Sequence, residues 1–452
     1  MSEAPKKIYI RTFGCQMNDY DSERMYRLME REGWQRQAEP EGADLIVVNT
    51  CSVREKAEHK ALSEVGMMRK YKAEKPGTMI ALAGCVAQQM GETLLRKSPD
   101  LDLVFGTHAI DKLPALIENC AHEKRLAETS WDYDSLIDFE KIAPTATDNS
   151  LSWKGTRASG FVPIMRGCDK HCTFCIVPQT RGKEVSRPIG DIVREVRDLV
   201  DHGVKDVTLL GQIVNRYGRT FAETKAPVFH ELLDELAKIE GIYRLRFTSS
   251  HPTYITPELI TRFRDMPQLA SHVHLPVQSG SDRLLKTMRR GHKIDEYLDK
   301  VRELREARPG ISITTDLIVG YPGETEDEFE LTLQLIRDAE FDSLYAFKYS
   351  PRPNTPAENE PETLTESEKS DRLARLFEVA LPQALARNKA LVGKSMDILV
   401  EGESRTPGRY YGRTACNRMV YFPAESLAVG DVVAVRIDEA FQNALAGTLA
   451  AN

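Results

Sequence analysis

The sequence lacks any run that approaches the ~18 consecutive apolar residues of a membrane span. Its start, Met1 to Lys7, has neither the apolar core nor the cleavage site of a secretory signal. It also lacks an excess of basic charge, since the formal net charge is −7. That value argues against a uniformly basic nucleic-acid binder but allows a local basic patch. We therefore expect a cytoplasmic protein without a membrane segment.

Cysteine is scarce, with eight in 452 residues. In a reducing compartment such cysteines serve metals or catalysis more often than disulfides, so their spacing carries the information. Hydrophobic residues make up 41% and charged residues 29% of the chain, which is typical of a folded globular protein. At ~150 residues per domain, the length predicts about three domains.

The chain divides by pattern into an α/β fold with three parts. Alternating apolar strands and helices over residues 1–123 predict a small parallel α/β domain. Residues 124–158 become polar and are interpreted as a linker. Six strand–helix units over 159–387 predict a partial (β/α)6 barrel, and short β-rich runs over 388–452 predict a small β-barrel.

The expected elements of the first part are strands at 7–14, 44–50, 79–84 and 101–106 and helices such as 19–32 and 54–72. The expected barrel strands are 161–166, 206–211, 243–249, 272–278, 312–319 and 343–349. Helical patterns follow them at 191–202, 228–240, 256–265, 281–288, 294–307, 325–339 and 365–389. The last part has β-rich runs at 396–400, 409–414, 418–422 and 432–437.

The densest motif is a Cys-x3-Cys-x2-Cys loop after the first barrel strand, formed by Cys168, Cys172 and Cys175. Three thiolates on one loop can bind three irons of a four-iron cubane cluster. The fourth iron is then open to another molecule. A zinc site is the alternative, but it normally takes a fourth Cys or His at a regular offset, and His171 lies between two of the ligands. The motif favours an iron-sulfur cluster.

A second set consists of Cys15, Cys51 and Cys85, each of which directly follows an expected strand of the first domain. The carboxyl ends of parallel strands share one edge of the sheet, so these cysteines should converge. Three buried structural thiols are the alternative. Cys120 and Cys416 have no such partners in the pattern and are interpreted as structural.

The cysteine loop on a (βα)6 pattern resembles the radical S-adenosylmethionine superfamily. With both cysteine sets placed, nearly the whole chain is similar to the methylthiotransferases, and the end from about 388 is similar to the TRAM module. The motifs that carry this resemblance are 12–18, 49–54, 83–85, 167–170, 274–282, 315–324 and 349–353. The run from His274 to Gly280 favours the branch that acts on a dimethylallyl-modified adenosine.

The resemblance implies an enzyme that adds sulfur and a methyl group to N(6)-dimethylallyladenosine at position 37 of tRNA, with two S-adenosylmethionine molecules per product. It implies two 4Fe-4S clusters, with the auxiliary one on Cys15, Cys51 and Cys85. The implied partners are the tRNA anticodon stem-loop, an electron donor such as flavodoxin or ferredoxin, and a sulfur donor. A monomer is expected. Alternatives are methylthiolation of threonylcarbamoyladenosine or of a ribosomal protein aspartate, and a zinc-containing RNA-binding protein without catalysis.

Five residues at the ends of two barrel strands are candidates for binding the nucleoside cofactor: Gln278, Ser279, Asp316, Ile318 and Gly320. Ordinary loop and packing roles are the alternative for each. The family pattern is broken at Arg166, Gln179, Ile213 and Lys348, but no expected cluster ligand is affected.

RNA contact is expected in the last domain, where residues 404–424 contain no acidic residue. The candidate phosphate-binding residues are Arg405, Arg409, Arg413 and Arg418, which accompany Tyr410 and Tyr411. A solvated basic face is the alternative.

Overall fold

The computed structural model describes residues 4–52, 57–131, 157–221 and 228–450. The chain forms two compact units, and the boundary between them is not the single linker expected from the sequence. The first unit comprises residues 1–150, 166–170 and 176–185, and the second comprises 151–165, 171–175 and 186–452. The three-cysteine loop therefore contributes segments to both units. In the described residues, no helix is both long and apolar enough to cross a membrane.

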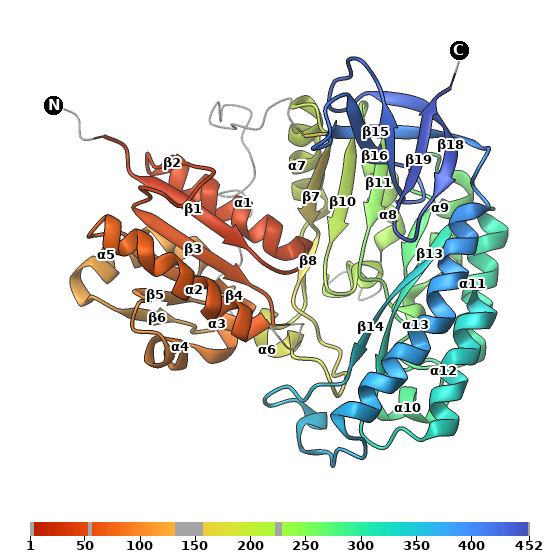
Figure 1. The fold of residues 1–452 in the computed structure, drawn as a ribbon, viewed down its shortest axis with the longest axis horizontal. Coiled ribbons are helices and arrows are strands. Elements are labelled where there is room, and N and C mark those ends of the chain that lie inside the picture. The colour runs from red at the N-terminus through yellow and green to blue at the C-terminus, as the bar shows by residue number, and fades with distance from the viewer. Residues whose placement is uncertain (1–3, 53–56, 132–156, 222–227, 451–452) are drawn as a thin grey trace. The chain divides into compact units, whose positions relative to one another are not determined.

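The first unit contains a parallel six-stranded sheet in the order β2-β1-β3-β4-β5-β6 (Figure 1). Its strands are β1 (Lys7–Thr12), β2 (Gln35–Arg36), β3 (Leu45–Thr50), β4 (Met79–Gly84), β5 (Leu103–Phe105) and β6 (Leu126–Glu128). The edge strands β2 and β6 are not among the expected ones, and β6 lies in the expected linker. It pairs with β5 through the main chain, which needs no apolar pattern. Of that linker, residues 132–156 lie outside the described residues.

Helices cover both faces of this sheet. α1 (Gln16–Arg31) and α5 (Leu113–Glu123) pack on one face, and α2 (Ala57–Glu74), α3 (Cys85–Met90) and α4 (Glu92–Lys97) pack on the other. This two-sided cover explains why every residue of β3 is buried, as expected for a central parallel strand. The first residues of the helix expected at 54–72 lie outside the described residues.

The second unit contains the expected six barrel strands as two parallel sheets, β11-β10-β7 and β12-β13-β14. The strands are β7 (Ser159–Pro163), β10 (Asp206–Leu210), β11 (Arg244–Phe247), β12 (His272–His274), β13 (Ser312–Val319) and β14 (Ser343–Lys348). The short strands β8 (Met165–Arg166) and β9 (Val185–Ser186) lie where the chain passes between units.

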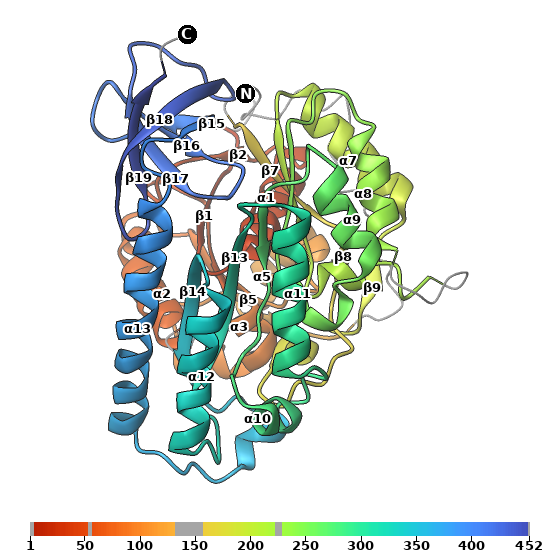
Figure 2. The ribbon, with the colours of Figure 1, turned by 90° about the vertical axis from the view of Figure 1, so that its right-hand side faces the viewer.

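Helices pack on the outer side of these sheets around one large core, except α10, which packs in a separate small cluster with Tyr321 and Tyr349. They are α7 (Ile189–Asp201), α8 (Phe229–Ala237), α9 (Pro257–Asp265), α10 (Asp282–Thr287), α11 (Ile294–Ala307), α12 (Glu326–Ala339) and α13 (Glu366–Lys389). Figure 2 shows α11, α12 and α13 side by side along β13 and β14. Capping boxes at Thr325 and Thr365 fix where α12 and α13 begin.

The C-terminal residues form a closed barrel in the order β15-β16-β17-β19-β18. Its strands are β15 (Ser395–Glu403), β16 (Arg409–Arg413), β17 (Met419–Pro423), β18 (Val432–Ala440) and β19 (Leu445–Leu449), the last of which is not among the expected runs. This small barrel contacts the partial barrel within the second unit, because Arg244 and Arg246 donate hydrogen bonds to the carbonyls of Arg413 and Thr414. The α/β class and its three-part architecture are confirmed.

Candidate functional site

The first cysteine set gathers at one edge of the sheet in the first unit. Cys15 precedes the first residue of α1, Cys51 directly follows β3, and Cys85 directly follows β4 and begins α3. Thr12 pairs with Asn49 and Thr50 with Gly84, so the three strands end at the same level. Cys15 is exposed, and a hydrogen bond with Cys51 lowers the pKa of its thiol.

Two glycines allow the chain to pass close to this edge. A Cβ on Gly14, whose φ is +143°, would lie 2.6 Å from the Cβ of Cys51. A Cβ on Gly84, whose φ is +91°, would lie 2.3 Å from the carbonyl oxygen of Thr50. Larger residues would therefore push the cysteine-bearing loops apart.

Buried amides hold the same loops in place. The Asn18 amide donates to the Thr50 carbonyl across 2.9 Å, and the Asn49 amide donates to the Asn18 carbonyl across 2.9 Å. In the described part of the chain, no three Cys, His, Asp or Glu side chains are drawn together tightly enough to hold a metal ion. A four-iron cubane takes its thiolates at separate iron corners, and an all-thiol set on fixed loops fits that group.

The second cysteine set lies on the loop shared by the two units. In the first unit, the backbone N–H of Cys168 donates to the Gly182 carbonyl across 3.0 Å. In the second unit, Nη1 of the buried Arg290 lies 3.5 Å from Sγ of Cys172. The hydroxyls of Thr173 and Tyr321 lie 2.8 Å apart and anchor the loop beside α10. Sequence reasoning missed Arg290, since no spacing rule links it to the cysteines.

The candidate cofactor residues meet where β12 leads into its following loop beside β13. Gln278 has φ = +87°, which is rare for a residue with a side chain and is typical of functional sites. Its N–H donates to the Asp316 carbonyl, and its own carbonyl accepts from the N–H of Ile318, both across 2.9 Å. Ser279 is fully buried.

The side chain of Asp316 and the backbone of Gly320 complete this group of candidates. Oδ2 of Asp316 lies 3.4 Å from Nε2 of His274 on β12. Gly320 has φ = +71°, and its N–H donates to the Glu324 carboxylate across 2.6 Å. Ile318 packs in the same small cluster as Phe174 of the cysteine loop. The structure therefore brings the cofactor candidates and part of the cysteine loop to one region of the second unit.

Two exposed aromatic side chains on β14 were missed by the sequence analysis. Tyr345 is 54% and Phe347 37% exposed, although both lie in a barrel strand. They pair in register with Asp316 and Ile318, so they share a face of the sheet with these cofactor candidates. Their spacing of two residues in an expected strand was the available signal, since it places both side chains on one face. Lys348, one of the departures from the family pattern, instead forms an ion pair with Glu366 on α13.

The four arginines of the C-terminal barrel have different environments. Arg405 and Arg409 are exposed, and Arg413 forms an ion pair with Glu401 across 3.2 Å. Arg418 is paired internally with Asp342 and Asn388, and its side chain is only 12% exposed. Expecting Arg418 to bind phosphate overlooked this buried pairing, which leaves its guanidinium unavailable to RNA.

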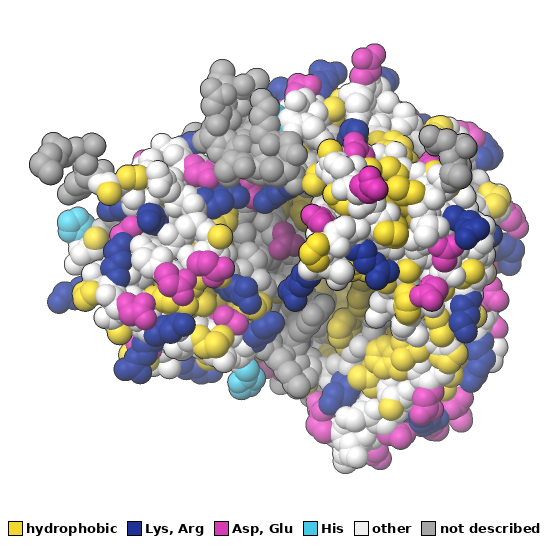
Figure 3. All heavy atoms as spheres, turned by 45° about the horizontal axis from the view of Figure 1, so that its top comes forward, with side chains coloured by type: hydrophobic (Ala, Val, Ile, Leu, Met, Phe, Trp, Pro, Cys, Tyr) yellow, Lys and Arg dark blue, Asp and Glu magenta, His cyan; other side chains and the backbone are white. Residues whose placement is uncertain are grey.

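The charges on the visible face also bear on RNA contact. Figure 3 shows Lys and Arg side chains interspersed with Asp and Glu on that face. This distribution agrees with the net charge of −7. Any phosphate contact on this face must therefore be local.

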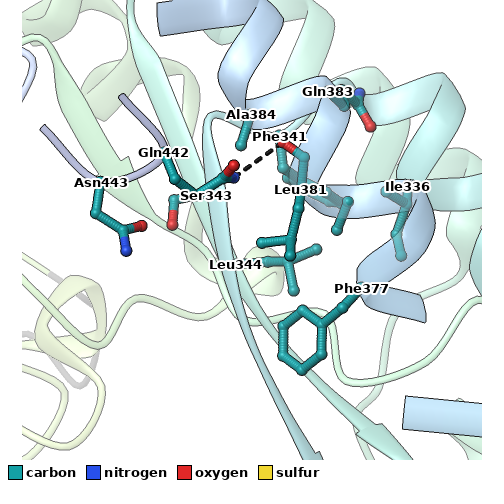
Figure 4. A pocket seen from close by; sticks show the side chains of 11 residues that line it. Ile336, Phe341, Ser343, Leu344, Phe377, Leu381, Gln383, Ala384, Gln442 and Asn443 are labelled. Atoms are coloured by element: carbon teal, nitrogen blue, oxygen red, sulfur yellow. Dashed lines mark hydrogen bonds between the residues drawn. The ribbon is translucent and has the colours of Figure 1, made fainter. Parts of the chain in front are cut away.

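One cavity in the second unit is separate from these residues. It has a volume of about 210 Å³ and lies between α12, α13 and the loop that carries Gln442 and Asn443 (Figure 4). Apolar side chains such as Phe341 and Phe377 line much of it. Because no cysteine or cofactor candidate reaches it, it is not the candidate site.

Comparison with known proteins agrees with this arrangement. Residues 7–106 match the family described as Uncharacterized protein family UPF0004, residues 162–336 the Radical SAM superfamily, and residues 389–450 the TRAM domain. The tRNA-2-methylthio-N(6)-dimethylallyladenosine synthase of Nitrosomonas europaea is 44% identical over 98% of both chains. The enzyme of the same name from Cellvibrio japonicus is 43% identical over 99% of this chain and 97% of that protein.

Solved structures show the same fold at low sequence identity. A radical S-adenosylmethionine methyltransferase of Kitasatospora setae matches with a TM-score of 0.56 and 13% identity, over 78% of this chain and 75% of that one. The full-length enzyme relatives argue against the alternative of a zinc-containing RNA-binding protein without catalysis. The chain belongs to the tRNA-2-methylthio-N(6)-dimethylallyladenosine synthase family of radical S-adenosylmethionine methylthiotransferases, enzymes whose cofactors are two 4Fe-4S clusters and S-adenosylmethionine.

Proposed function

We propose that this enzyme converts N(6)-dimethylallyladenosine at position 37 of tRNA to its 2-methylthio derivative and uses two S-adenosylmethionine molecules per product. The observation that carries the proposal is the gathering of Cys15, Cys51 and Cys85 at one sheet edge. A second cluster site in the same chain as a radical S-adenosylmethionine barrel suits sulfur insertion, which the barrel cluster alone does not explain. The names of the full-length relatives support the dimethylallyl substrate.

The two cysteine sets have separate tasks in this proposal. Cys168, Cys172 and Cys175 bind the barrel cluster, while Cys15, Cys51 and Cys85 bind the auxiliary cluster. When bound, the barrel cluster with S-adenosylmethionine supplies a radical, and the auxiliary cluster supplies the sulfur to be methylated. The protein orients the cysteine loops through its buried amides and glycines, and it excludes water by packing the loop at Thr173 against Tyr321.

The cofactor nucleoside is assigned to the group around Gln278. Ser279 and Asp316 offer polar atoms to the ribose and methionyl parts, while the backbone at Ile318 and Gly320 approaches the adenine. Tyr345 and Phe347 lie on the same sheet face and give the target base and its isoprenoid group an aromatic surface. Stacking on such side chains is worth about 1–3 kcal/mol per base.

Arg405, Arg409 and Arg413 are the proposed contacts to the anticodon stem-loop, with Arg418 left out because of its buried ion pair. Flavodoxin or ferredoxin as electron donor, a separate sulfur donor, a monomeric state and a cytoplasmic location remain the predictions of the sequence. A tRNA substrate agrees with that location.

The test uses anaerobically reconstituted enzyme, S-adenosylmethionine, a reductant and tRNA that carries N(6)-dimethylallyladenosine. We expect mass spectrometry of the digested tRNA to find the 2-methylthio nucleoside, with two S-adenosylmethionine molecules consumed per product. The matched control is the Cys15→Ala/Cys51→Ala/Cys85→Ala variant, which should still release 5′-deoxyadenosine but make no product. Product formation only on threonylcarbamoyladenosine tRNA, or product from the control variant, would refute the proposal.

A further inference from the structure

The helix that follows the three-cysteine loop belongs to the N-terminal unit. α6 (Val177–Arg181) begins two residues after Cys175 and packs against α3. The hydroxyl of Thr107 donates to the Thr180 carbonyl across 2.6 Å. Gly182 ends the helix with φ = +75°, and a Cβ there would come within 2.8 Å of the Trp131 ring. The last turn of α6 is therefore fixed against the first unit.

Arg181, at the end of this helix, brings a buried positive charge to the first cysteine set. Its guanidinium forms an ion pair with Asp21 of α1 across 2.8 Å, and the two side chains are 8% and 5% exposed. The contact lacks hydrogen-bond geometry, so Nη2 of Arg181 makes no hydrogen bond there. α6 packs against α3, which begins at Cys85, and Asp21 lies on α1, which begins next to Cys15. The guanidinium therefore lies near the starts of both cysteine-bearing helices.

A guanidinium stays protonated at any pH the protein tolerates, so this is a permanent charge. In a buried site of low dielectric constant, a nearby cation favours a group that gains an electron. Hydrogen bonds and charges beside the sulfur ligands are the means by which proteins set the potential of iron-sulfur clusters. Asp21 has the opposite effect, and it also holds the guanidinium in place.

We propose that Arg181 tunes the auxiliary cluster: held by Asp21 near the cysteine-bearing starts of α1 and α3, its positive charge makes that cluster easier to reduce. The proposal rests on the proposed function only in assigning these cysteines to a cluster. It also means that the polypeptide after the barrel cysteines supplies a fixed positive charge to the unit that holds the other cysteine set.

The test measures the midpoint potential of the auxiliary cluster by titration followed with electron paramagnetic resonance. The parent protein is the full chain with Cys168, Cys172 and Cys175 changed to Ala, which retains only the auxiliary cluster. We expect Arg181→Met to weaken reduction at least tenfold, a shift of about 59 mV to lower potential for one electron. Arg181→Lys should stay within about twofold of the parent because it keeps the charge.

Two further variants separate an electrostatic role from a structural one. Asp21→Asn should shift the potential upward, opposite to Arg181→Met, because it removes a negative charge and keeps the cation. Arg36→Met is the control, since Arg36 forms its ion pair with Glu23 at the other end of the sheet, and it should leave the potential unchanged.

Unchanged potentials in Arg181→Met, or shifts of the same sign in Arg181→Met and Asp21→Asn, would overturn the proposal. If Arg181→Met takes up no iron, Asp21→Asn decides: an upward shift supports the role of Arg181, and no shift or a downward one refutes it. Absence of iron from the parent would instead refute the cluster assignment of the proposed function. Because no tRNA is present, failed product formation does not affect this measurement.

Discussion

Arg290 lies far from Cys172 in the sequence, yet its Nη1 lies 3.5 Å from the Cys172 Sγ. Its Nη2 donates to the Pro276 carbonyl across 2.8 Å, so the buried side chain is held from both ends. The charged donor therefore lies at a proposed ligand of the barrel cluster, a role comparable to the one proposed for Arg181 at the auxiliary cluster.

We expect Arg290→Met to lower the midpoint potential of the barrel cluster and to slow formation of 5′-deoxyadenosine. A hydrogen bond to a charged group is worth about 1.5–3 kcal/mol, so the reduction equilibrium should weaken about 10-fold to 160-fold. Arg290→Lys keeps the charge and should lower the midpoint potential by a smaller amount. The potential is measured in a protein that lacks the auxiliary cysteines, and an unchanged value with full iron content would contradict the expectation.

Iron content tests whether the two cysteine sets are independent. Reconstituted protein should bind about eight irons as two cubanes, and the Cys168→Ala/Cys172→Ala/Cys175→Ala variant about four. The same loss is expected for the Cys15→Ala/Cys51→Ala/Cys85→Ala variant, while Cys120→Ala should retain all the iron. Full iron in either triple variant, or complete loss with the fold intact by circular dichroism, would be inconsistent with two separate sites.

Glu328 predicts a dependence of stability on pH. Burial raises the pKa of its carboxyl, but hydrogen bonds from Arg283, Thr325 and Ser281 outweigh burial and bring the pKa to about 2. Because this value lies below the ordinary one, the stabilisation is complete above the ordinary pKa and is lost as the pH falls toward about 2. Because Arg283 is half exposed, solvent screens part of this interaction. We therefore expect the ionised Glu328 carboxylate to contribute about 2 kcal/mol to the unfolding free energy at neutral pH.

This expectation is checked by urea unfolding of cluster-free Glu328→Gln beside the wild-type protein. The difference in unfolding free energy should be largest near pH 7 and should shrink below about pH 4.5. Glu330→Gln, on the exposed side of α12, is the control and should change little. A difference that grows as the pH falls would show that the sign is wrong.

The arginines of the C-terminal barrel should divide into two groups. Arg405→Ala and Arg409→Ala should weaken tRNA binding and flatten its log–log salt dependence by about 0.7–0.9 per lost phosphate contact. Arg418→Met should instead lower the unfolding free energy by about 3 kcal/mol or more, because it leaves Asp342 buried with one cation fewer. Equal salt slopes in wild-type protein and the Arg405→Ala/Arg409→Ala variant would mean that these residues form only a solvated surface.

Sequence patterns predicted those features that depend on short stretches of the chain, such as a strand and the residue that directly follows it. Cys15, Cys51 and Cys85 follow apolar runs, and parallel strands bring such positions to one edge. The patterns did not reveal β6, because a three-residue edge strand is set by main-chain pairing. They also did not reveal Arg181 at the first cysteine set, because its contact with Asp21 joins residues 160 positions apart.

The arginines of the C-terminal barrel also show that sequence patterns do not predict contacts between distant parts of the chain. Arg418 and Arg409 occupy similar positions in a basic run, yet one is buried against Asp342 and the other is exposed. Composition cannot separate them, since burial depends on how the small barrel contacts the partial barrel. The positive φ of Gln278 likewise depends on its pairing with β13. Nothing in the sequence signalled it, because the position is occupied by glutamine and not by glycine.

The packing of α6 in the first unit has a consequence for synthesis of the chain. A ribosome releases residues in order, and domains generally fold as their last residues emerge. The N-terminal unit lacks its own last helix until residue 185 has left the ribosome, long after its sheet is complete at Glu128. Its final packing must therefore wait until the start of the barrel and its three-cysteine loop have been synthesised.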